Sequence, residues 1–366
     1  MRNPPFTLRR SETANTLRPN LDWSKPFALE GRPTLTPAFQ WREPTSYIPQ
    51  WSFAIQRQLS TATSAEVSYL GSAGVKLERT VYYNSAPPGP PGDQNLRRPF
   101  PTIFANLQLV MRGAHSSYHS LQAKLQRRFS RGFTLLTSLT YGKSIDNGSG
   151  VRAVTGDAYT PQDSLDLRNE RGLSAFDFRR RWTTSLLYEL PFGRGKALLG
   201  SAPAIVNAVL GGWQVGGIFT LQDGFPFTIN CSSNATYENA SGGCRADALG
   251  IDPYLSSDKR GPDRWFNTTA FVDRIDFVRG VGPYRYGNSG RNNITGPGIV
   301  EVDASITKFF QPTERTKVEF RSEFFNIPNH PIFGQPGSTL GNSTYGVIGS
   351  TRLDSRQIQF GLKLSF

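Results

Sequence analysis

The residues that most often carry chemistry are scarce in this sequence and form no recognisable catalytic set. There are only three histidines, His115, His119 and His330. His115 and His119 are four positions apart, a spacing that would converge on a metal ion in a helix but not in a strand or loop. No Ser-His-Asp arrangement stands out. We therefore expect no enzyme activity, no catalytic or metal-binding residues, and no cofactor.

Two cysteines, Cys231 and Cys244, flank a polar segment rich in turn-forming residues. Two cysteines are too few for a disulfide scaffold, and they lack the neighbours that a zinc site needs. They could form a local disulfide in an oxidising compartment or remain two free thiols. The sequence leaves both states open.

The long segment around these cysteines, residues 225–297, has the composition most suggestive of binding. Aromatic rings are interleaved with arginine and asparagine, which suits the capture of a small ligand such as a glycan, a peptide or a siderophore. The alternative is that these side chains pack the segment against itself. The candidate ligand contacts are Trp265, Phe266, Tyr284, Arg285, Tyr286 and Arg291.

The overall composition limits the classes of protein to which a chain with such a segment can belong. The formal net charge of the 366 residues is +13, but the basic residues are isolated along the chain and form no patch, so we expect no nucleic-acid partner. No run of 18 or more apolar residues exists, which excludes spanning helices but not spanning strands of about 9–11 residues. The start, MRNPPFTLRRSE, is basic without an apolar core. We therefore expect no signal peptide and a chain that is a fragment.

The last segment, Arg356 to Phe366, shows the clearest strand pattern. Apolar and polar residues alternate over its whole length, and the chain ends on an aromatic residue. A terminal aromatic strand of this kind resembles the signal by which barrel-assembly machinery recognises outer-membrane proteins. The residues of this predicted assembly signal are Phe360, Leu362, Leu364 and Phe366.

The same alternation predicts about nine strands joined by connections of alternating length. The strands are Trp51–Leu59, Ala65–Lys76, Tyr118–Phe129, Phe133–Ser144, Arg181–Leu190, Trp213–Asp223, Ile299–Phe310, Lys317–Ile327 and Arg356–Phe366. Short turns follow the odd strands, and long polar segments, about 77–117, 145–178, 225–297 and 328–354, follow the even ones. One short-side connection is longer and contains a brief helix at Ala204–Leu210.

Outer-membrane barrels have this asymmetry, with short periplasmic turns and long extracellular loops. Aromatic residues near the strand ends, among them Trp51, Tyr69 and Trp182, suit the girdles at the two membrane interfaces, although a soluble β-sandwich would also bury aromatic side chains. The sequence thus predicts an all-β protein: a partial antiparallel transmembrane β-barrel of about nine or more strands, with long extracellular loops and a periplasmic C-terminus.

An ordered series of segments resembles one family in particular. The segments are SYIPQWSFAIQRQL, AEVSYLGSAGVKL, SSYHSLQAKLQRRFSRGFTLLTSLTYGKSIDNGSG, RGLSAFDFRRRWTTSLLYELPFGRGK, GGWQVGGIFTLQDGFPFTI, DRWFNTTAF and RQIQFGLKLSF. In this order they resemble the C-terminal barrel of TonB-dependent receptors of the Oar-like, acidobacterial type. The resemblance begins near Tyr47 and covers nearly all of the chain after it.

The resemblance implies a division of the chain and a function. Residues 1–46 would be a preceding loop or partial strand, and 47–366 the C-terminal part of the barrel, without the plug, the TonB box and the N-terminal strands of the family. It implies a place in the cell outer membrane, contact with its lipid, and nutrient uptake powered through the TonB system by the missing parts. A structural or adhesive barrel that displays its loops without active transport is the alternative.

Overall fold

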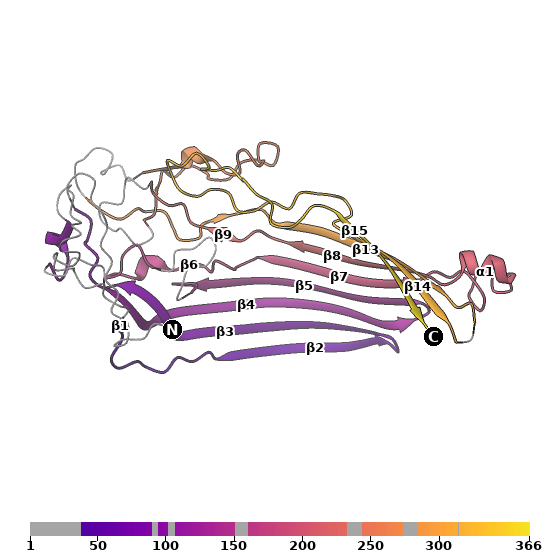
Figure 1. Cartoon of the computed structure of the whole chain (residues 1–366). Coiled ribbons are helices and arrows are strands. Elements are labelled where there is room, and N and C mark those ends of the chain that lie inside the picture. Colours follow the sequence, from indigo (N-terminus) through magenta and orange to yellow (C-terminus); the bar gives the residue numbers. More distant parts are fainter. Residues whose placement is uncertain are drawn as a thin grey trace, which may run out of the picture.

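The structure is a computed structural model that describes residues 38–89, 94–101, 107–150, 160–232, 244–273, 284–313 and 315–366. Nine long strands form one open sheet in which each strand lies beside its predecessor along the chain, from β2 at one edge to β15 at the other (Figure 1). All neighbours among them are antiparallel. The predicted all-β, partial-barrel fold is therefore confirmed. The predicted region 1–46 lies mostly outside the described residues.

The long strands are those expected from the alternating pattern. They are β2 (Gln50–Ser60), β3 (Thr63–Tyr82), β4 (Gln108–Ser130), β5 (Phe133–Asp146), β7 (Arg180–Glu189), β8 (Trp213–Gln222), β13 (Ile299–Phe310), β14 (Lys317–Phe325) and β15 (Gln357–Ser365). The short elements are β1 (Ala38–Phe39), β6 (Gly172–Leu173), β9 (Pro226–Phe227), β10 (Asp247–Ala248), β11 (Phe271–Val272), β12 (Ile294–Thr295), three 3-10 turns (Gln94–Arg97, Arg168–Glu170, Thr268–Ala270) and α1 (Ala204–Leu210).

Two of the predicted strand ends were wrong. β3 continues past Lys76 to Tyr82, and β4 begins at Gln108 instead of Tyr118, so the connection expected at 77–117 is shorter. An irregularity in register between Gly74 and Leu77 interrupts the alternation of apolar and polar residues, so the sequence pattern ends before the strand does. Beyond the bilayer a strand needs no apolar face, and Glu78 and Arg112 form an ion pair of 2.8 Å across this part of the hairpin.

The register gives the sheet one apolar and one polar face, because residues directly opposite each other in neighbouring strands point to the same side. One row across seven strands reads Ile55, Val67, Ala123, Leu139, Trp182, Leu221, Val300. The next row reads Gln56, Glu66, Lys124, Ser138, Thr183, Thr220, Glu301. We call the face of the first row the outward face and that of the second the inward face. Apolar-out, polar-in alternation is the pattern of a membrane barrel wall.

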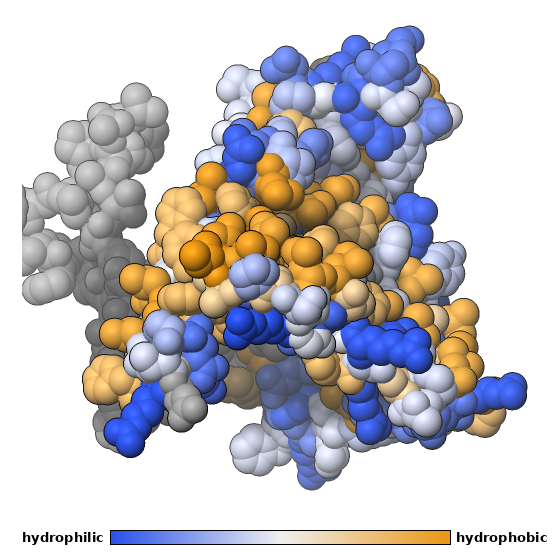
Figure 2. All heavy atoms as spheres, turned by 90° about the vertical axis from the view of Figure 1, so that its right-hand side faces the viewer, coloured by the Kyte–Doolittle hydropathy of each residue, from blue (hydrophilic) through white to orange (hydrophobic). Residues whose placement is uncertain are grey.

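The end of the sheet with the short turns also carries α1 and the C-terminus (Figure 1). The tight β4–β5 turn uses Arg131 and Gly132, both at positive φ. The indole Nε1 of Trp213 donates to the Val209 carbonyl at 2.9 Å and so ties the end of α1 to β8. Seen end-on, hydrophobic side chains gather near the centre of this end (Figure 2). On α1, Ile205, Val209 and Leu210 are exposed. No helix among the described residues is long and apolar enough to cross a membrane.

Candidate functional site

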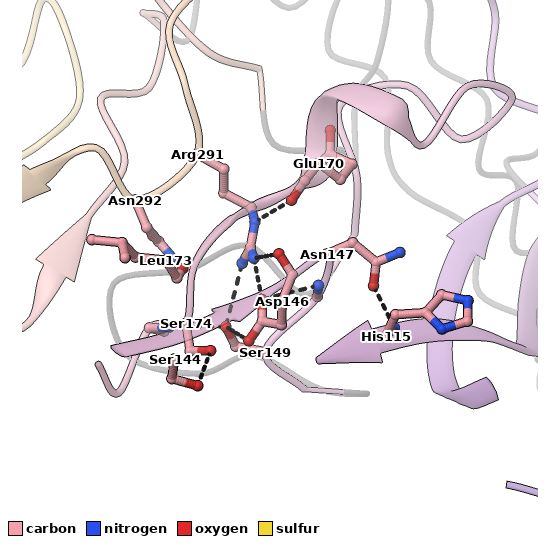
Figure 3. Close-up of polar contacts among 12 residues, drawn as sticks. His115, Ser144, Asp146, Asn147, Ser149, Glu170, Leu173, Ser174, Arg291 and Asn292 are labelled. Carbon is pink, nitrogen blue, oxygen red and sulfur yellow. Dashed lines mark hydrogen bonds and ion pairs between the residues drawn. The ribbon is translucent and has the colours of Figure 1, made fainter. Parts of the chain in front are cut away.

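At the opposite end, long loops cover the ends of the strands, and a buried ion pair holds them there. Asp146 is the last residue of β5, and Arg291 comes from the segment just before β12. The Arg291 guanidinium pairs with the Asp146 carboxylate and also donates to the carbonyl oxygens of Asp146 at 2.9 Å and Glu170 at 2.8 Å (Figure 3). The two side chains are only 4% and 3% exposed. The buried pair therefore connects the end of β5 with the loop segments that contain Glu170 and Arg291.

A second buried pair extends this connection. Both carboxylate oxygens of Glu170 accept from Arg245 Nη1 at 3.1 Å, and each of these side chains is 4% exposed. Gln162 bridges the same segments: its Nε2 donates to the Gly287 carbonyl at 3.0 Å, and its Oε1 accepts from the Arg245 amide at 3.3 Å. Buried charges are stable only when paired and hydrogen-bonded, and both pairs meet that condition. We call Asp146, Glu170, Arg245 and Arg291 the loop-clamp residues.

Two other carboxylates fix neighbouring parts of the loops. Asp247 accepts from Arg285 Nη1 and Nη2, both at 2.9 Å. Asp177 accepts from the Ser144 amide at 2.5 Å, and burial raises the pKa of its carboxyl group although this hydrogen bond acts in the opposite direction. Ser144 and Ser174 add a hydroxyl–hydroxyl contact of 2.7 Å beside it (Figure 3).

The loops also have a small apolar core of their own. It consists of Phe227, Ile229, Ala246, Phe266, Ala270, Phe271 and Ile294, with Tyr345 from the β14–β15 connection packed against it. Phe266 is fully buried, and its ring lies 5.3 Å from that of Tyr345 between centroids. Burial raises the pKa of the Tyr345 phenol. Cys231 and Cys244 are joined by a disulfide, with a Cα–Cα distance of 5.5 Å.

The predicted ligand contacts occupy two different environments. Phe266 and Arg291 are buried, the first in the loop core and the second in the clamp, so neither faces solvent. Arg285 is exposed although it is bound to Asp247, and Tyr284 and Tyr286 are partly exposed beside it. Trp265 is partly buried, and its Nε1 donates to the Thr295 carbonyl at 2.9 Å. The structure thus assigns Phe266 and Arg291 to loop packing and leaves four of the six with access to solvent.

The predicted assembly signal lies on the outward face of the last strand. Phe360, Leu362, Leu364 and Phe366 are 67%, 75%, 58% and 98% exposed. Phe360 stacks on Phe320 of β14 with ring centroids 6.3 Å apart. These side chains therefore form an apolar row available to lipid or to a partner.

The sequence pattern missed the loop-clamp residues other than Arg291. Asp146 lies two residues beyond the predicted strand Phe133–Ser144, and Glu170 and Arg245 lie in polar segments that look solvated. Nothing local distinguishes them from the partly exposed Asp166 and the exposed Arg168 in the same loop region. Among the described residues, no group of three or more His, Cys, Asp or Glu side chains could hold a metal ion.

A comparison with protein families shows to which family of proteins this sheet and its loops belong. A family model described as an outer membrane beta barrel domain matches residues 1–359. The chain belongs to this outer membrane β-barrel family. Membership places the barrel in the outer membrane, with lipid against the outward face and the polar face inside.

Two solved structures that resemble this barrel are outer membrane transporters. The transporter YddB from Escherichia coli is 9% identical with a TM-score of 0.42, and the match covers 91% of this chain and 34% of that one. The FrpB iron transporter from Neisseria meningitidis is 11% identical with a TM-score of 0.40, covering 90% and 33%. The barrel thus spans about a third of the length of these proteins. No curated protein matches the sequence.

Proposed function

We propose that this chain is the barrel segment of a TonB-dependent receptor of the Oar-like type, which takes up a small nutrient across the outer membrane. The observation that carries the proposal is the combination of a polar inward wall with long loops clamped over its extracellular end. A passage lined by Gln, Ser, Thr and a few charges accepts polar solutes. Loops held by buried ion pairs keep their contact residues in place before a ligand arrives, which lowers the entropy cost of binding.

The proposed capture site consists of the predicted contacts that remain accessible. Tyr284, Arg285 and Tyr286 are consecutive, and the Arg285–Asp247 contact holds this segment in position. Aromatic faces with an arginine beside them suit a glycan, a peptide or a siderophore. Because the barrel spans about a third of its structural relatives, uptake is proposed for the whole receptor, with the TonB system as the energy source and barrel-assembly machinery as the partner in its insertion.

Uptake in cells tests this proposal. We would express the complete receptor gene that contains this barrel and measure accumulation of radiolabelled oligosaccharides, oligopeptides and ferric siderophores, with and without TonB. One ligand class should accumulate only when TonB is present. Arg285→Ala should weaken its binding about tenfold, as expected for a loss of ~1.4 kcal/mol, while Arg168→Ala, an exposed change outside the proposed contacts, should leave it unchanged. TonB-independent accumulation would contradict the proposal.

A structural or adhesive barrel is the second candidate, and the loop core is the observation that favours it. Loops with their own apolar cluster and disulfide form a fixed surface that could display a binding face without any passage. The same experiment separates the two functions. Ligand that binds to cells but is never internalised, whatever the state of TonB, would support display over transport.

A further inference from the structure

A cavity of about 570 Å³ lies at the extracellular ends of β5, β7 and β8; of the predicted ligand contacts it includes Trp265 but not the segment Tyr284 to Tyr286. From the strands and the residues directly next to their ends it is lined by Tyr141, Arg179, Arg180 and Asp223. From the segment between β10 and β11 it is lined by Tyr254, Arg260 and Trp265. The cavity is open to solvent and lies between strand ends on one side and a loop on the other.

The strand residues of this cavity point outward, toward lipid. Tyr141 lies directly opposite Arg180 and two positions beyond Leu139 of the outward row. Asp223 lies two positions beyond Leu221 of the same row and accepts from Arg180 at 2.9 and 3.0 Å. The distance from Phe133, at the turn end of β5, to Tyr141 is roughly 26 Å at ~3.3 Å per residue. Allowing for strand tilt, the cavity lies near the upper edge of an apolar band about 25 Å tall.

The cavity holds positive charge that no described carboxylate neutralises by direct contact. Asp223 is already bound to Arg180, and Asp177, which also acts electrostatically on Arg179, is held by the Ser144 amide. Among the described residues, Arg179 and Arg260 form no ion pair. Arg179 lies 5.9 Å from the centre of the Tyr141 ring, and Arg260 lies 5.2 Å from that of Trp265.

We propose that this cavity binds the phosphate-bearing headgroup of a glycolipid in the outer leaflet. Guanidinium groups suit phosphate because they offer parallel N–H donors in a plane, and basic pockets at the membrane surface recognise lipid headgroups. Arg179 and Arg260 bind the phosphate, and the rings of Tyr254 and Trp265 pack against the sugar. The acyl chains continue down the outward face over Leu139 and Trp182, both exposed. Free phosphate presents the same anionic group but has no acyl chains to contact Leu139 and Trp182.

The test uses the full chain refolded in detergent micelles, with two synthetic probes. One is an acylated glucosamine disaccharide that carries two phosphates, and the other is the same lipid after phosphatase treatment. Native mass spectrometry counts bound lipid, and titration gives the Kd. The phosphorylated lipid should bind at least tenfold more tightly than the dephosphorylated one. Arg179→Gln/Arg260→Gln should remove most of this preference.

Matched controls separate the site from general attraction between arginine and anionic lipid. Arg57→Gln on the outward face of β2 and Arg194→Gln near α1 remove two charges elsewhere and should leave the preference intact. Equal binding of the two lipids to the unchanged chain would overturn the proposal, and this comparison does not depend on whether a variant folds. So would an undiminished preference in the Arg179→Gln/Arg260→Gln chain. Displacement of the lipid by an equal concentration of inorganic phosphate would assign the site to free phosphate and overturn the lipid headgroup.

Discussion

At the scale of single residues, the loop-clamp residues have the strongest dependence on one another. Asp146 and Arg291 are both almost fully buried, and residues far apart in the chain meet there. A buried charge that loses its partner keeps its desolvation cost, so removing one member is more harmful than removing both. The clamp therefore sets whether the long loop stays docked on β5.

Replacing Asp146 with Asn should undock that loop. The unpaired Arg291 guanidinium would cost about 3–5 kcal/mol of local stability, which limited proteolysis and hydrogen exchange over residues 284–295 would detect. Asp146→Asn/Arg291→Met should recover part of the protection, since no unpaired buried charge is left and the Glu170–Arg245 pair is intact. Arg168→Gln, which breaks an exposed pair with Asp166, serves as the control and should not change protection of this segment.

Asp177 should make the stability of the loop region depend on pH. Burial raises the pKa of this carboxyl group above its ordinary value of 3.8, so the folded chain keeps the proton after the unfolded chain has lost it. Stability should then fall as the pH rises from about 3.8 through the higher folded pKa. Asp177→Asn should flatten this dependence in urea unfolding followed by tryptophan fluorescence. The same decline in the Asn variant as in the parent would show that another group is responsible.

At the scale of elements, each strand fits the barrel wall only if its apolar face contacts lipid and its polar face contacts the water-filled interior. Val67 and Ser68 are adjacent in β3, yet Val67 belongs to the outward row and Ser68 lies beside Gln122 on the inward face. Because Val67 and Ser68 are adjacent in one strand and lie at almost the same depth in the membrane, they differ mainly in the face to which their side chains point.

An arginine at these two positions should have opposite consequences. Val67→Arg places a cation against lipid near the middle of the apolar band and should cost about 2–4 kcal/mol, whereas Ser68→Arg faces the polar side and should cost little. Unfolding in urea from lipid vesicles would measure the difference. Equal costs for the two variants would contradict the assignment of outward and inward faces.

The last strand should control how well the chain enters the membrane. Phe366 is almost fully exposed and completes the apolar row of Phe360, Leu362 and Leu364. Phe366→Ser should reduce the amount assembled in the outer membrane severalfold, and Ser365→Ala, on the other face, should not. The measure is the heat-modifiable band of membrane fractions on gels. Normal assembly of Phe366→Ser would argue against this residue as a recognition signal.

At the scale of the whole molecule, the described sheet is open, with β2 and β15 at its edges (Figure 1). Nine antiparallel strands in succession make β2 and β15 run in the same direction. In lipid every backbone polar group must find a partner, so both edges must be covered. Antiparallel closure therefore requires an odd number of additional strands, and a second copy of this sheet would bring β15 against β2 in parallel.

Hydrogen exchange should reveal the open edge of the described sheet. In micelles of the chain alone, the β2 amides that point away from β3 should exchange much faster than the amides of β5, because β5 has a neighbouring strand on both sides. Size measurement by light scattering should show one chain per micelle. Slow exchange along β2 together with a two-chain particle would mean that copies do pair at this edge.

The sequence by itself determined the positions of the nine long strands, the turn helix Ala204–Leu210 and the two faces of the wall. Alternation with a period of two is local, and lipid on one side and water on the other enforce it along each strand. The fate of loop residues is not local. Phe266 and Arg291 read like their exposed neighbours, and only contacts with Tyr345, Asp146 and Glu170, distant along the chain, bury them. The tertiary structure alone decided which loop side chains hold the loops and which remain available to a ligand, because burial there depends on the packing of separate loops and not on any repeating pattern.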